Sequence, residues 1–280
     1  MTIESRNLYL QYDHETVVED LSLTIVPGEV TALVGPNGSG KSTLLKAMAR
    51  VLRPARGAVH LDSESISSYA ARAVARRLAL LPQSPEAPMG LSVRELAEYG
   101  RYPWRRSFQG LGPADHAAVD RALTLTGMMA FADRSLGTLS GGQQQRAWIA
   151  MTLSQDADTL LLDEPTSFLD MAHQVELMGL IERLNVEENR TILIVLHDLN
   201  QAARIAHRMV VLQQGAIAAD GPPDAVMTAH MLRRVFGVEA DIIADPRRGT
   251  PVCLPFAADV VDGYNANHYH SRFPSRNYTE

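Results

Sequence analysis

Residues 35–43 read Gly35-Pro36-Asn37-Gly38-Ser39-Gly40-Lys41-Ser42-Thr43, and this segment sets the class of fold. The β-type run Val30–Val34 leads into it, and residues 41–51 have helical spacing of apolar side chains. Glycines let the backbone wrap closely around a polyphosphate, and the helix N-terminus adds unpaired N–H donors. A plain glycine-rich turn is the alternative. The strand–loop–helix context instead predicts a phosphate-binding loop, in which Lys41 reaches the β- and γ-phosphates of a nucleotide and Ser42 ligates Mg²⁺.

A second segment, Leu160-Leu161-Leu162-Asp163-Glu164-Pro165, is an apolar strand that ends in two adjacent carboxylates. In an open α/β sheet, ligands sit at the carboxyl ends of the strands, so these acids are expected beside the phosphates. Asp163 suits the Mg²⁺ shell, and Glu164 is placed to polarise the attacking water. Alone, such a pair is more often a solvated strand end or a helix cap. Beside a phosphate loop we favour the functional interpretation.

Strand and helix patterns alternate through most of the chain, which is typical of a parallel α/β sheet. Strands are expected at 78–81, 159–162, 191–196 and 209–212, and helices at 171–184 and 199–205. Between about residues 84 and 154 strand-like runs vanish, and helices are predicted at 93–99, 114–125 and 143–153. The sequence therefore predicts an α/β core, 1–83 and 155–255, interrupted by a helical subdomain at about 84–154. Residues 256–280 are predicted to form a C-terminal extension.

The composition excludes several classes of function. The 280 residues are 46% hydrophobic and 21% charged with a net charge of −6, so there is no general electrostatic reason to bind nucleic acid. Cys253 is the only cysteine, so no internal disulfide can form, which suits a reducing compartment. No signal peptide is visible, and the apolar runs fall below the roughly 20 residues that span a bilayer. A role at a membrane is therefore expected to depend on a separate partner.

The segment Leu139-Ser140-Gly141-Gly142-Gln143 precedes one of the predicted helices. By itself it is a helix N-cap with a glycine hinge or an anion-binding helix start. Together with the phosphate loop and the Asp163-Glu164 strand, it resembles the signature motif of the ABC ATPase family. The resemblance implies a P-loop ABC ATPase core with an antiparallel β part and an inserted helical subdomain, and it implies hydrolysis of ATP with Mg²⁺.

The resemblance also assigns the remaining motifs of the family. Gln83 looks like the glutamine that senses Mg²⁺ and the γ-phosphate, and Ser167-Phe168-Leu169-Asp170 resembles the D-loop, in which Asp170 is expected to touch the site. His197 resembles the switch histidine, and Tyr12 sits where the family places a ring against adenine. Each has an alternative: Gln83 as a turn residue, His197 as a helix cap beside Asp198, and Tyr12 as a packing residue.

In this family two subunits pair head to tail across ATP. The resemblance implies that Ser140, Gly141 and Gly142, with Gln143, complete the partner's site in a homodimer. Glu164 would be the general base, and His197 would hold the γ-phosphate. Permease subunits, reached by a substrate-binding protein, are the implied membrane partners. The implied location is peripheral, on the cytoplasmic face of the inner membrane.

Two less specific motifs resemble the iron-chelate importer branch of the family. Leu91-Ser92-Val93-Arg94-Glu95-Leu96 leads into Gly100-Arg101-Tyr102-Pro103, and the run Asp245-Pro246-Arg247-Arg248-Gly249-Thr250-Pro251 precedes Cys253-Leu254-Pro255. The resemblance, which covers about residues 1–255, implies import of ferric siderophores. Cobalamin, haem or metal-ion import, or a soluble ABC ATPase outside transport, are the alternatives.

Overall fold

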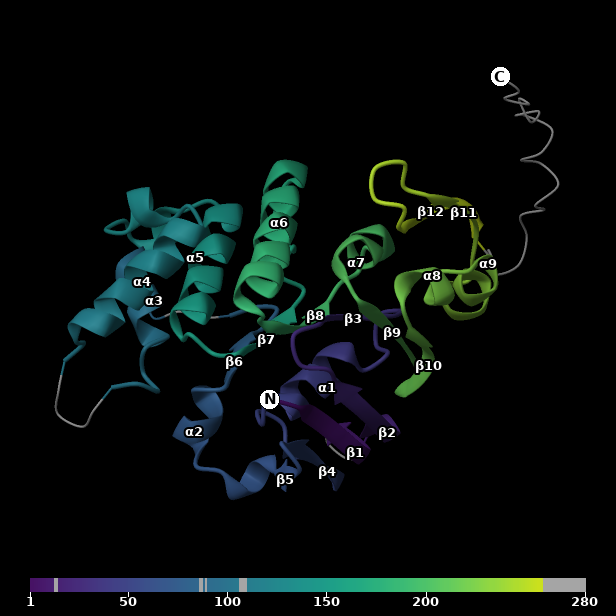
Figure 1. Cartoon of the computed structure of the whole chain (residues 1–280), viewed down its shortest axis with the longest axis horizontal. Coiled ribbons are helices and arrows are strands. Elements are labelled where there is room, and N and C mark those ends of the chain that lie inside the picture. Colours follow the sequence, from purple (N-terminus) through teal and green to yellow (C-terminus); the bar gives the residue numbers. More distant parts are fainter. Residues whose placement is uncertain (13–14, 86–87, 89, 106–109, 259–280) are drawn as a thin grey trace.

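A computed structural model describes residues 1–12, 15–85, 88, 90–105 and 110–258. Its centre is a six-stranded sheet (Figure 1). The strands lie in the order β10 (Ala216–Gly221), β9 (Arg208–Gln213), β3 (Val30–Val34), β8 (Thr191–Val195), β7 (Thr159–Asp163) and β6 (Leu78–Leu81). All neighbours are parallel except β10, which runs antiparallel to β9. The mostly parallel sheet predicted from the sequence is confirmed.

Both faces of this sheet are covered, which explains why its central strands are apolar throughout. Val30, Ala32 and Val34 of β3 pack in the same cluster as the buried side chains of α6 (Met171–Glu188) and α7 (Leu199–Ile205). Leu33 points to the other face, where it packs with α1 (Lys41–Met48). Figure 1 shows α6 and α7 on one side of the sheet and α1 on the other. Helix α1 ends three residues before the predicted end at 51.

A four-stranded antiparallel sheet packs against α1 and completes the core. Its order is β2 (Glu15–Ile25), β1 (Ile3–Tyr12), β4 (Arg56–Leu61) and β5 (Glu64–Ser65). The inward side chains of these strands share one apolar cluster with α1 and with Leu33 of β3. The antiparallel part expected from the family resemblance is therefore present.

A helical lobe lies between β6 and β7. It contains α3 (Val93–Tyr99), α4 (Pro113–Leu125) and α5 (Gly141–Ser154), with short 3₁₀ turns η2 (Met129–Phe131) and η3 (Leu136–Thr138). The lobe has its own apolar core, which includes Leu96, Leu123 and Ala147. In α3, Ser92 accepts a hydrogen bond from Glu95 N while Glu95 accepts one from Ser92 N, the capping box that starts a helix.

The C-terminal part folds back beside α7. The short helices α8 (Pro223–Val226) and α9 (Ala229–Met231) and a π-helical turn η4 (Leu232–Phe236) precede a hairpin of β11 (Val238–Ala244) and β12 (Pro251–Ala258). The sequence patterns did not predict these elements. Strand β12 runs three residues past Pro255, and the rest of the predicted extension lies outside the described residues. Asn200 of α7 exchanges two hydrogen bonds with the backbone of Cys253, which fixes the hairpin to the core.

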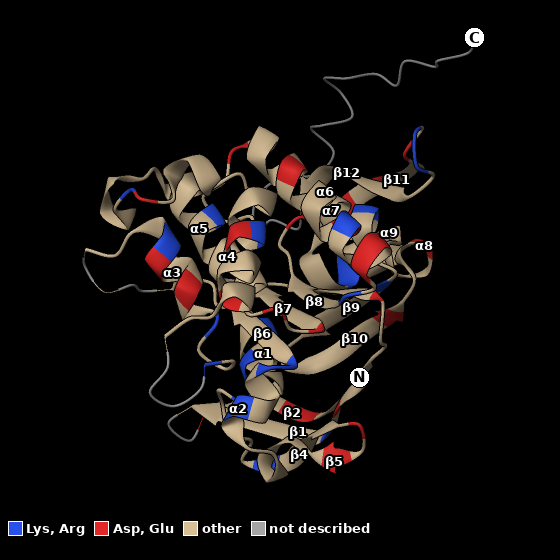
Figure 2. Cartoon of the chain, turned by 60° about the vertical axis from the view of Figure 1, so that its left-hand side comes forward, with Lys and Arg blue, Asp and Glu red and all other residues tan. Residues whose placement is uncertain are grey.

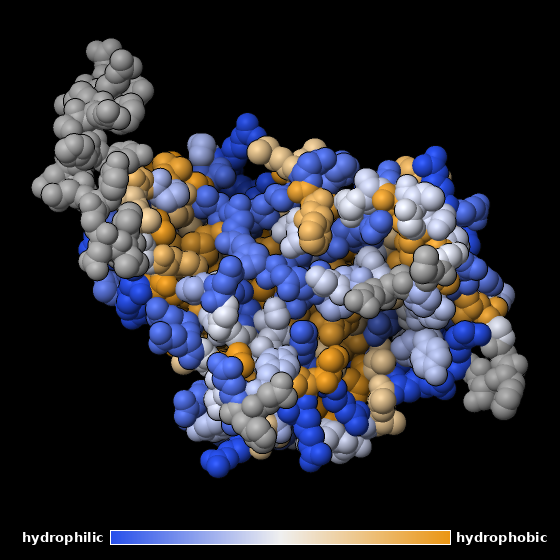
Figure 3. Space-filling view, turned by 180° about the vertical axis from the view of Figure 1, so that it is seen from behind, coloured by the Kyte–Doolittle hydropathy of each residue, from blue (hydrophilic) through white to orange (hydrophobic). Residues whose placement is uncertain are grey.

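Within the described residues, no helix combines the length and the apolar character that a membrane span needs. Figure 3 shows one face of the surface, where hydrophilic residues alternate with smaller hydrophobic patches. Two further short elements, η1 (Ile66–Ser68) and α2 (Ala71–Ala75), connect the antiparallel sheet to β6.

Candidate nucleotide site

The phosphate loop joins the end of β3 to the start of α1, as predicted. Two of its glycines have left-handed φ values and no room for a side chain. A Cβ on Gly35 (φ 147°) would lie 2.1 Å from Leu212 O, and one on Gly40 (φ 98°) would lie 2.8 Å from Val18 Cγ2. Neighbouring strands therefore press the loop backbone into a tight curve that only glycine allows.

Lys41 is the first residue of α1, and its side chain folds back over this loop. Its Nζ donates hydrogen bonds to Gly35 O and Pro36 O, both at 2.9 Å. The side chain is buried, and this burial lowers the pKa of the Lys41 ammonium, while the charges of Glu164 and Asp163 oppose the shift. The cation is thus held inside the curve of the loop, beside two carboxylates.

Ser42 and Asp163 meet at the end of β7. Ser42 Oγ donates to Asp163 Oδ1 at 2.8 Å. Asp163 is 1% exposed, and its Oδ2 is buried without a hydrogen-bond partner among the described residues. Burial raises the pKa of the Asp163 carboxyl, and the Ser42 hydrogen bond opposes this shift. A buried carboxylate oxygen left without a partner needs a cation or a donor.

This oxygen set fits Mg²⁺. Within the described part of the chain, no group of three or more His, Cys, Asp or Glu could hold a metal alone. Mg²⁺ commonly binds through one or two protein oxygens and completes its shell with water and substrate phosphates. The hydroxyl of Ser42 and the free oxygen of Asp163 supply such a pair next to the phosphate loop.

Glu164 is the meeting point of three other segments. Its Oε2 accepts a hydrogen bond from Gln83 Nε2 at 2.6 Å, and its Oε1 lies 2.6 Å from His197 Nε2. Ser167 Oγ donates to Oε2 at 3.5 Å. Glu164 has φ 51°, in the left-handed region that non-glycine residues rarely adopt. Such strain is common where a side chain must be aimed at a functional position.

The contacts of Gln83 and His197 bear on the alternatives left open for these two residues, whose roles remain predictions. Asp198 caps α7, because its Oδ1 accepts from Asn200 N at 2.8 Å and from Gln201 N at 3.0 Å. His197 is therefore not needed as a cap, and its ring is directed to Glu164. Gln83 follows β6 and likewise reaches Glu164. The structure brings together six residues that the sequence singled out: Lys41, Ser42, Gln83, Asp163, Glu164 and His197.

The signature segment starts α5 in the helical lobe. Ser140 is the N-cap: its Oγ accepts from Gln143 N at 3.3 Å, and its N–H donates to Gln143 Oε1 at 3.1 Å. Ser140 and Gly141 are exposed, and Gly142 is partly exposed. Gly142 packs close to Leu169, since a Cβ there would lie 3.4 Å from Leu169 Cδ2. The signature segment therefore adjoins the D-loop of its own chain and presents its remaining face to solvent.

The other predicted site residues lie around these two regions. Asp170 is the N-cap of α6, where its carboxylate accepts from His173 N at 2.9 Å, and this hydrogen bond lowers the pKa of Asp170. Tyr12 ends β1, is 43% exposed and pairs with Glu15 across the hairpin. Thr43 is buried in α1. The stacking of Tyr12 on adenine remains a prediction.

Sequence reasoning missed Ser167 as a contact of Glu164. Ser167 lies three residues after Glu164, and the left-handed turn at Glu164 brings the two side chains together. Ser167 N also donates to Glu164 O at 3.1 Å. The spacing of three residues after a strand end is the only signal that could have indicated this contact.

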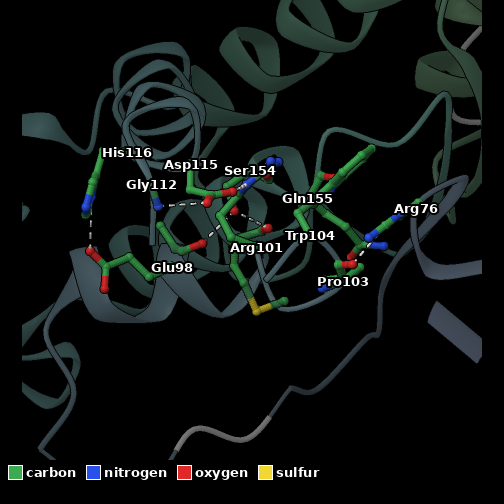
Figure 4. Close-up of polar contacts among 12 residues, drawn as sticks. Arg76, Glu98, Arg101, Pro103, Trp104, Gly112, Asp115, His116, Ser154 and Gln155 are labelled. Carbon is green, nitrogen blue, oxygen red and sulfur yellow. Dashed lines mark hydrogen bonds and ion pairs between the residues drawn. The ribbon is translucent and has the colours of Figure 1, made fainter. Parts of the chain in front are cut away.

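The segment Gly100-Arg101-Tyr102-Pro103 fastens the helical lobe to the core. A Cβ on Gly100 would lie 2.1 Å from Ser154 Oγ, so glycine permits close packing of α3 on α5. Arg101 is buried and donates to Ser154 O at 2.7 Å. Trp104 Nε1 donates to Gln155 O at 2.7 Å, and Figure 4 shows Trp104 beside Arg76, which lies just after α2. The guanidinium of Arg76 lies 5.0 Å from the Trp104 ring centre.

Comparisons with known proteins agree with this geometry. The ABC transporter family matches residues 18–167. The chain is 47% identical over 255 residues to the iron(3+)-hydroxamate import ATP-binding protein FhuC of Bacillus subtilis (strain 168), covering 91% of this chain and 95% of FhuC. It is 45% identical over 259 residues to the hemin import ATP-binding protein HmuV of Rhodopseudomonas palustris (strain BisA53), covering 89% and 93%.

A solved structure gives the same result for the fold. The dimeric post-hydrolysis state of the ATP-binding cassette MJ0796 with ADP and Pi superimposes with a TM-score of 0.70 at 26% identity, covering 79% of this chain and 98% of that one. The chain belongs to the ABC transporter family and is one of its ATP-hydrolysing subunits.

Proposed function

We propose that this chain hydrolyses ATP as a homodimer on the cytoplasmic face of the inner membrane and thereby drives a permease that imports ferric siderophores. The observation that carries the ATPase part is the Glu164 carboxylate, held by Gln83 and His197 next to the Ser42–Asp163 pair. The import part is supported by the similarity to FhuC along nearly the whole chain. Permease subunits and a substrate-binding protein are the partners that an importer of this kind requires.

Nucleotide binding rests on the phosphate loop. The backbone N–H groups of the curved loop and the start of α1 bind the phosphates, because they are unpaired donors at a positive helix end. The Lys41 ammonium lies within the loop curve and exchanges its carbonyl contacts for phosphate oxygens. Tyr12 supports the adenine ring. The nucleotide is thus held at both ends by residues of one chain.

Mg²⁺ fits next to these phosphates. Ser42 Oγ and the unpartnered Oδ2 of Asp163 would hold the ion, with the amide oxygen of Gln83 as a further ligand. When bound, it supplies neutralisation of the charge on the β- and γ-phosphate oxygens. The raised pKa of Asp163 expresses the cost of a lone buried carboxylate, which a cation removes.

Glu164 acts as the general base for the water that attacks the γ-phosphate. Its carboxylate accepts a proton as the water oxygen bonds to the γ-phosphorus and the bond to the ADP oxygen breaks. Gln83, Ser167 and His197 orient that carboxylate, and His197 also donates to the γ-phosphate oxygens. The chain positions and stabilises charge and forms no covalent intermediate. ADP and phosphate are the products.

The signature segment acts on the partner's nucleotide. Ser140, Gly141 and Gly142 present a hydroxyl and unpaired backbone N–H groups at the exposed start of α5. These donors suit a γ-phosphate, and the phosphate loop that holds one belongs to a second copy. Two copies related head to tail would bury both nucleotides between them, which makes ATP part of the dimer contact.

Hemin is the second candidate substrate, because the 45% identity to HmuV is close to the 47% identity to FhuC. Uptake of labelled ferric siderophore, hemin and cobalamin in the native cell separates the candidates. A cell carrying only Glu164→Gln should lose siderophore uptake and keep the other two. Glu187→Gln, an exposed carboxylate of α6, is the control and should support normal uptake. Loss of hemin uptake alone would shift the proposal to hemin, and normal uptake of all three would refute the import role.

A further inference from the structure

The loop that joins β11 to β12 forms the wall of a pocket that the ATPase cycle does not use. Residues 245–250 form a tight turn in which Asp245 Oδ1 accepts from Arg247 N at 2.7 Å, and Asp245 N donates to Thr250 O at 2.8 Å. Figure 1 shows the loop leaning over α7 toward α6. Arg248 closes the contact, because both of its terminal nitrogens bond the Glu182 carboxylate of α6.

The pocket beneath this loop has a volume of about 430 Å³. Its lining comes from α6, from the end of α7, from the start of β3 and from α8. Small-molecule sites are commonly concavities of roughly 300–1,000 Å³. The volume is therefore large enough for a small molecule.

Arg204 indicates which chemical group this pocket could bind. It lines the cavity from the last turn of α7, and its Nε is buried with no hydrogen-bond partner among the described residues. A guanidinium presents planar pairs of donors that match a carboxylate or a phosphate. The unpartnered Nε means that this atom is not paired with an acidic group among the described residues.

His207 adds a hydrogen-bond donor to this pocket, and the nitrogen that carries the proton can be assigned. Its Nδ1 accepts a hydrogen bond from Val30 N at 3.1 Å. The neutral ring must therefore carry its proton on Nε2, which becomes a donor in the same pocket lining. Arg204 and His207, which lie three residues apart, thus both contribute donor-bearing side chains to the pocket lining.

The remaining groups limit the ligand to one that is not purely anionic. Helix α7 ends at Ile205, and residues 203–206 line the pocket. The last carbonyls of a helix are unpaired acceptors with partial negative charge, which disfavour an anion alone and favour a donor. Asp224 also lines the pocket, and Glu182 is neutralised by Arg248. Figure 2 shows the basic and acidic segments interleaved around α6 and α7.

We propose that this pocket binds a small carboxylate that also carries a hydroxyl or ammonium group, with Arg204 holding the carboxylate. The site is placed to influence ATP turnover. Strand β3 begins at Val30 in the pocket lining and ends at the phosphate loop about 13 Å away. Helix α7, which ends in the lining, begins two residues after His197.

Three four-carbon acids test the ligand class, because malate and aspartate are succinate with one added hydroxyl or ammonium group. Calorimetric titration of the full chain should show millimolar or tighter binding of malate or aspartate, with succinate binding more weakly. Arg204→Gln should weaken that binding by roughly tenfold or more, as loss of a charge-assisted pair does. Arg183→Gln removes the same charge from the exposed side of α6, outside this lining, and should leave binding unchanged.

A second variant keeps the test valid if Arg204→Gln fails to fold. Val186 is 76% exposed at the pocket rim, so Val186→Trp should preserve the fold and obstruct entry while Arg204 remains. It should weaken the same binding, and both variants should retain the wild-type basal ATPase rate and melting temperature. No binding of any of the three acids at millimolar concentration would overturn the proposal. So would equal weakening by Arg183→Gln, or binding of inorganic phosphate alone.

Discussion

The cluster around Glu164 and the start of α5 differ in how their polar groups are paired. In the cluster, charges and hydrogen-bonding groups from four separate segments lie together: Lys41, Gln83, the Asp163–Glu164 pair and His197. At the start of α5, Ser140 bonds only its own helix turn, and the glycines present exposed backbone. The polar groups around Glu164 are paired within the chain, whereas those at the start of α5 are free to bind a group from outside it.

This difference identifies which functions one copy can perform alone. Under the proposed function, binding of a nucleotide and Mg²⁺ should depend on the assembled cluster, whereas turnover should also need the donors at the start of α5, which lie in a different lobe. Changes in the first region should therefore act on a single copy. Changes in the second should act only when two copies meet.

The largest effect is expected from Glu164→Gln. The amide has a single acceptor oxygen, so it can keep the hydrogen bond from Gln83 but cannot accept a proton, and a general base contributes about 10²–10⁴-fold to a rate. Steady-state phosphate release should fall by that factor, while ATP binding measured by fluorescence titration should stay within about twofold. Brisk turnover by the variant would remove the base assignment.

Gly142→Asp should impair the function of the start of α5 and leave that of the cluster around Glu164 intact. A carboxylate at the exposed start of α5 would face the partner's phosphates, and like charges in contact cost several kcal/mol. In a Glu164→Gln background, light scattering should show loss of the ATP-dependent dimer with unchanged ATP affinity of the single copy. Gly137→Asp is the matched control, since Gly137 is an exposed lobe glycine with open space around it. If Gly142→Asp weakened the affinity of a single copy for ATP, the start of α5 would not act only between two copies.

Lys41→Ala should weaken nucleotide binding by a smaller amount. Removing a charged donor from a phosphate contact costs about 1.5–3 kcal/mol, or roughly 10–100-fold in affinity. Titration with a fluorescent ATP analogue measures the change, and Lys46→Ala, one turn further along α1, is the comparison. Equal affinity of wild type and Lys41→Ala would argue against the phosphate-loop role.

The smallest effect concerns stability. Burial raises the pKa of Asp163 above that of the unfolded chain, so its ionisation destabilises the fold as pH rises through the folded pKa. Asp163→Asn cannot ionise there. The melting temperature of the variant minus that of wild type, measured without nucleotide or metal, should therefore increase from acid to neutral pH. A difference that stays flat over this range would show that Asp163 is not desolvated.

The sequence predicted the elements whose apolar pattern is strong. The bounds of β3, β6, α3 and α7 agree with expectation, because buried runs there end at glycine, proline or capping residues. The hairpin of β11 and β12 was missed, since its strands are largely exposed and mix Asp241 with Ile243 and Pro255 with Phe256. Half-exposed strands carry a weak periodic signal.

The residues of the site were predicted from motifs, but their mutual contacts were not. No pattern in the sequence indicates that Glu164 adopts a left-handed conformation or that Gln83 and His197 both bond it. The pocket at Arg204 could not be predicted either, because it forms where the loop at 245–250 meets helices from separate parts of the chain, α6, α7 and α8. Contacts of this kind depend on tertiary packing.

The double hydrogen bond between Asn200 and Cys253 keeps the single thiol of the chain inside the protein. Cys253 is 8% exposed, and burial raises its pKa, so little of the reactive thiolate forms. Cysteines introduced elsewhere can therefore be labelled without a competing site. One spin label on each copy, placed on the exposed lobe at Gly137, would report the distance between two lobes as ATP brings the copies together.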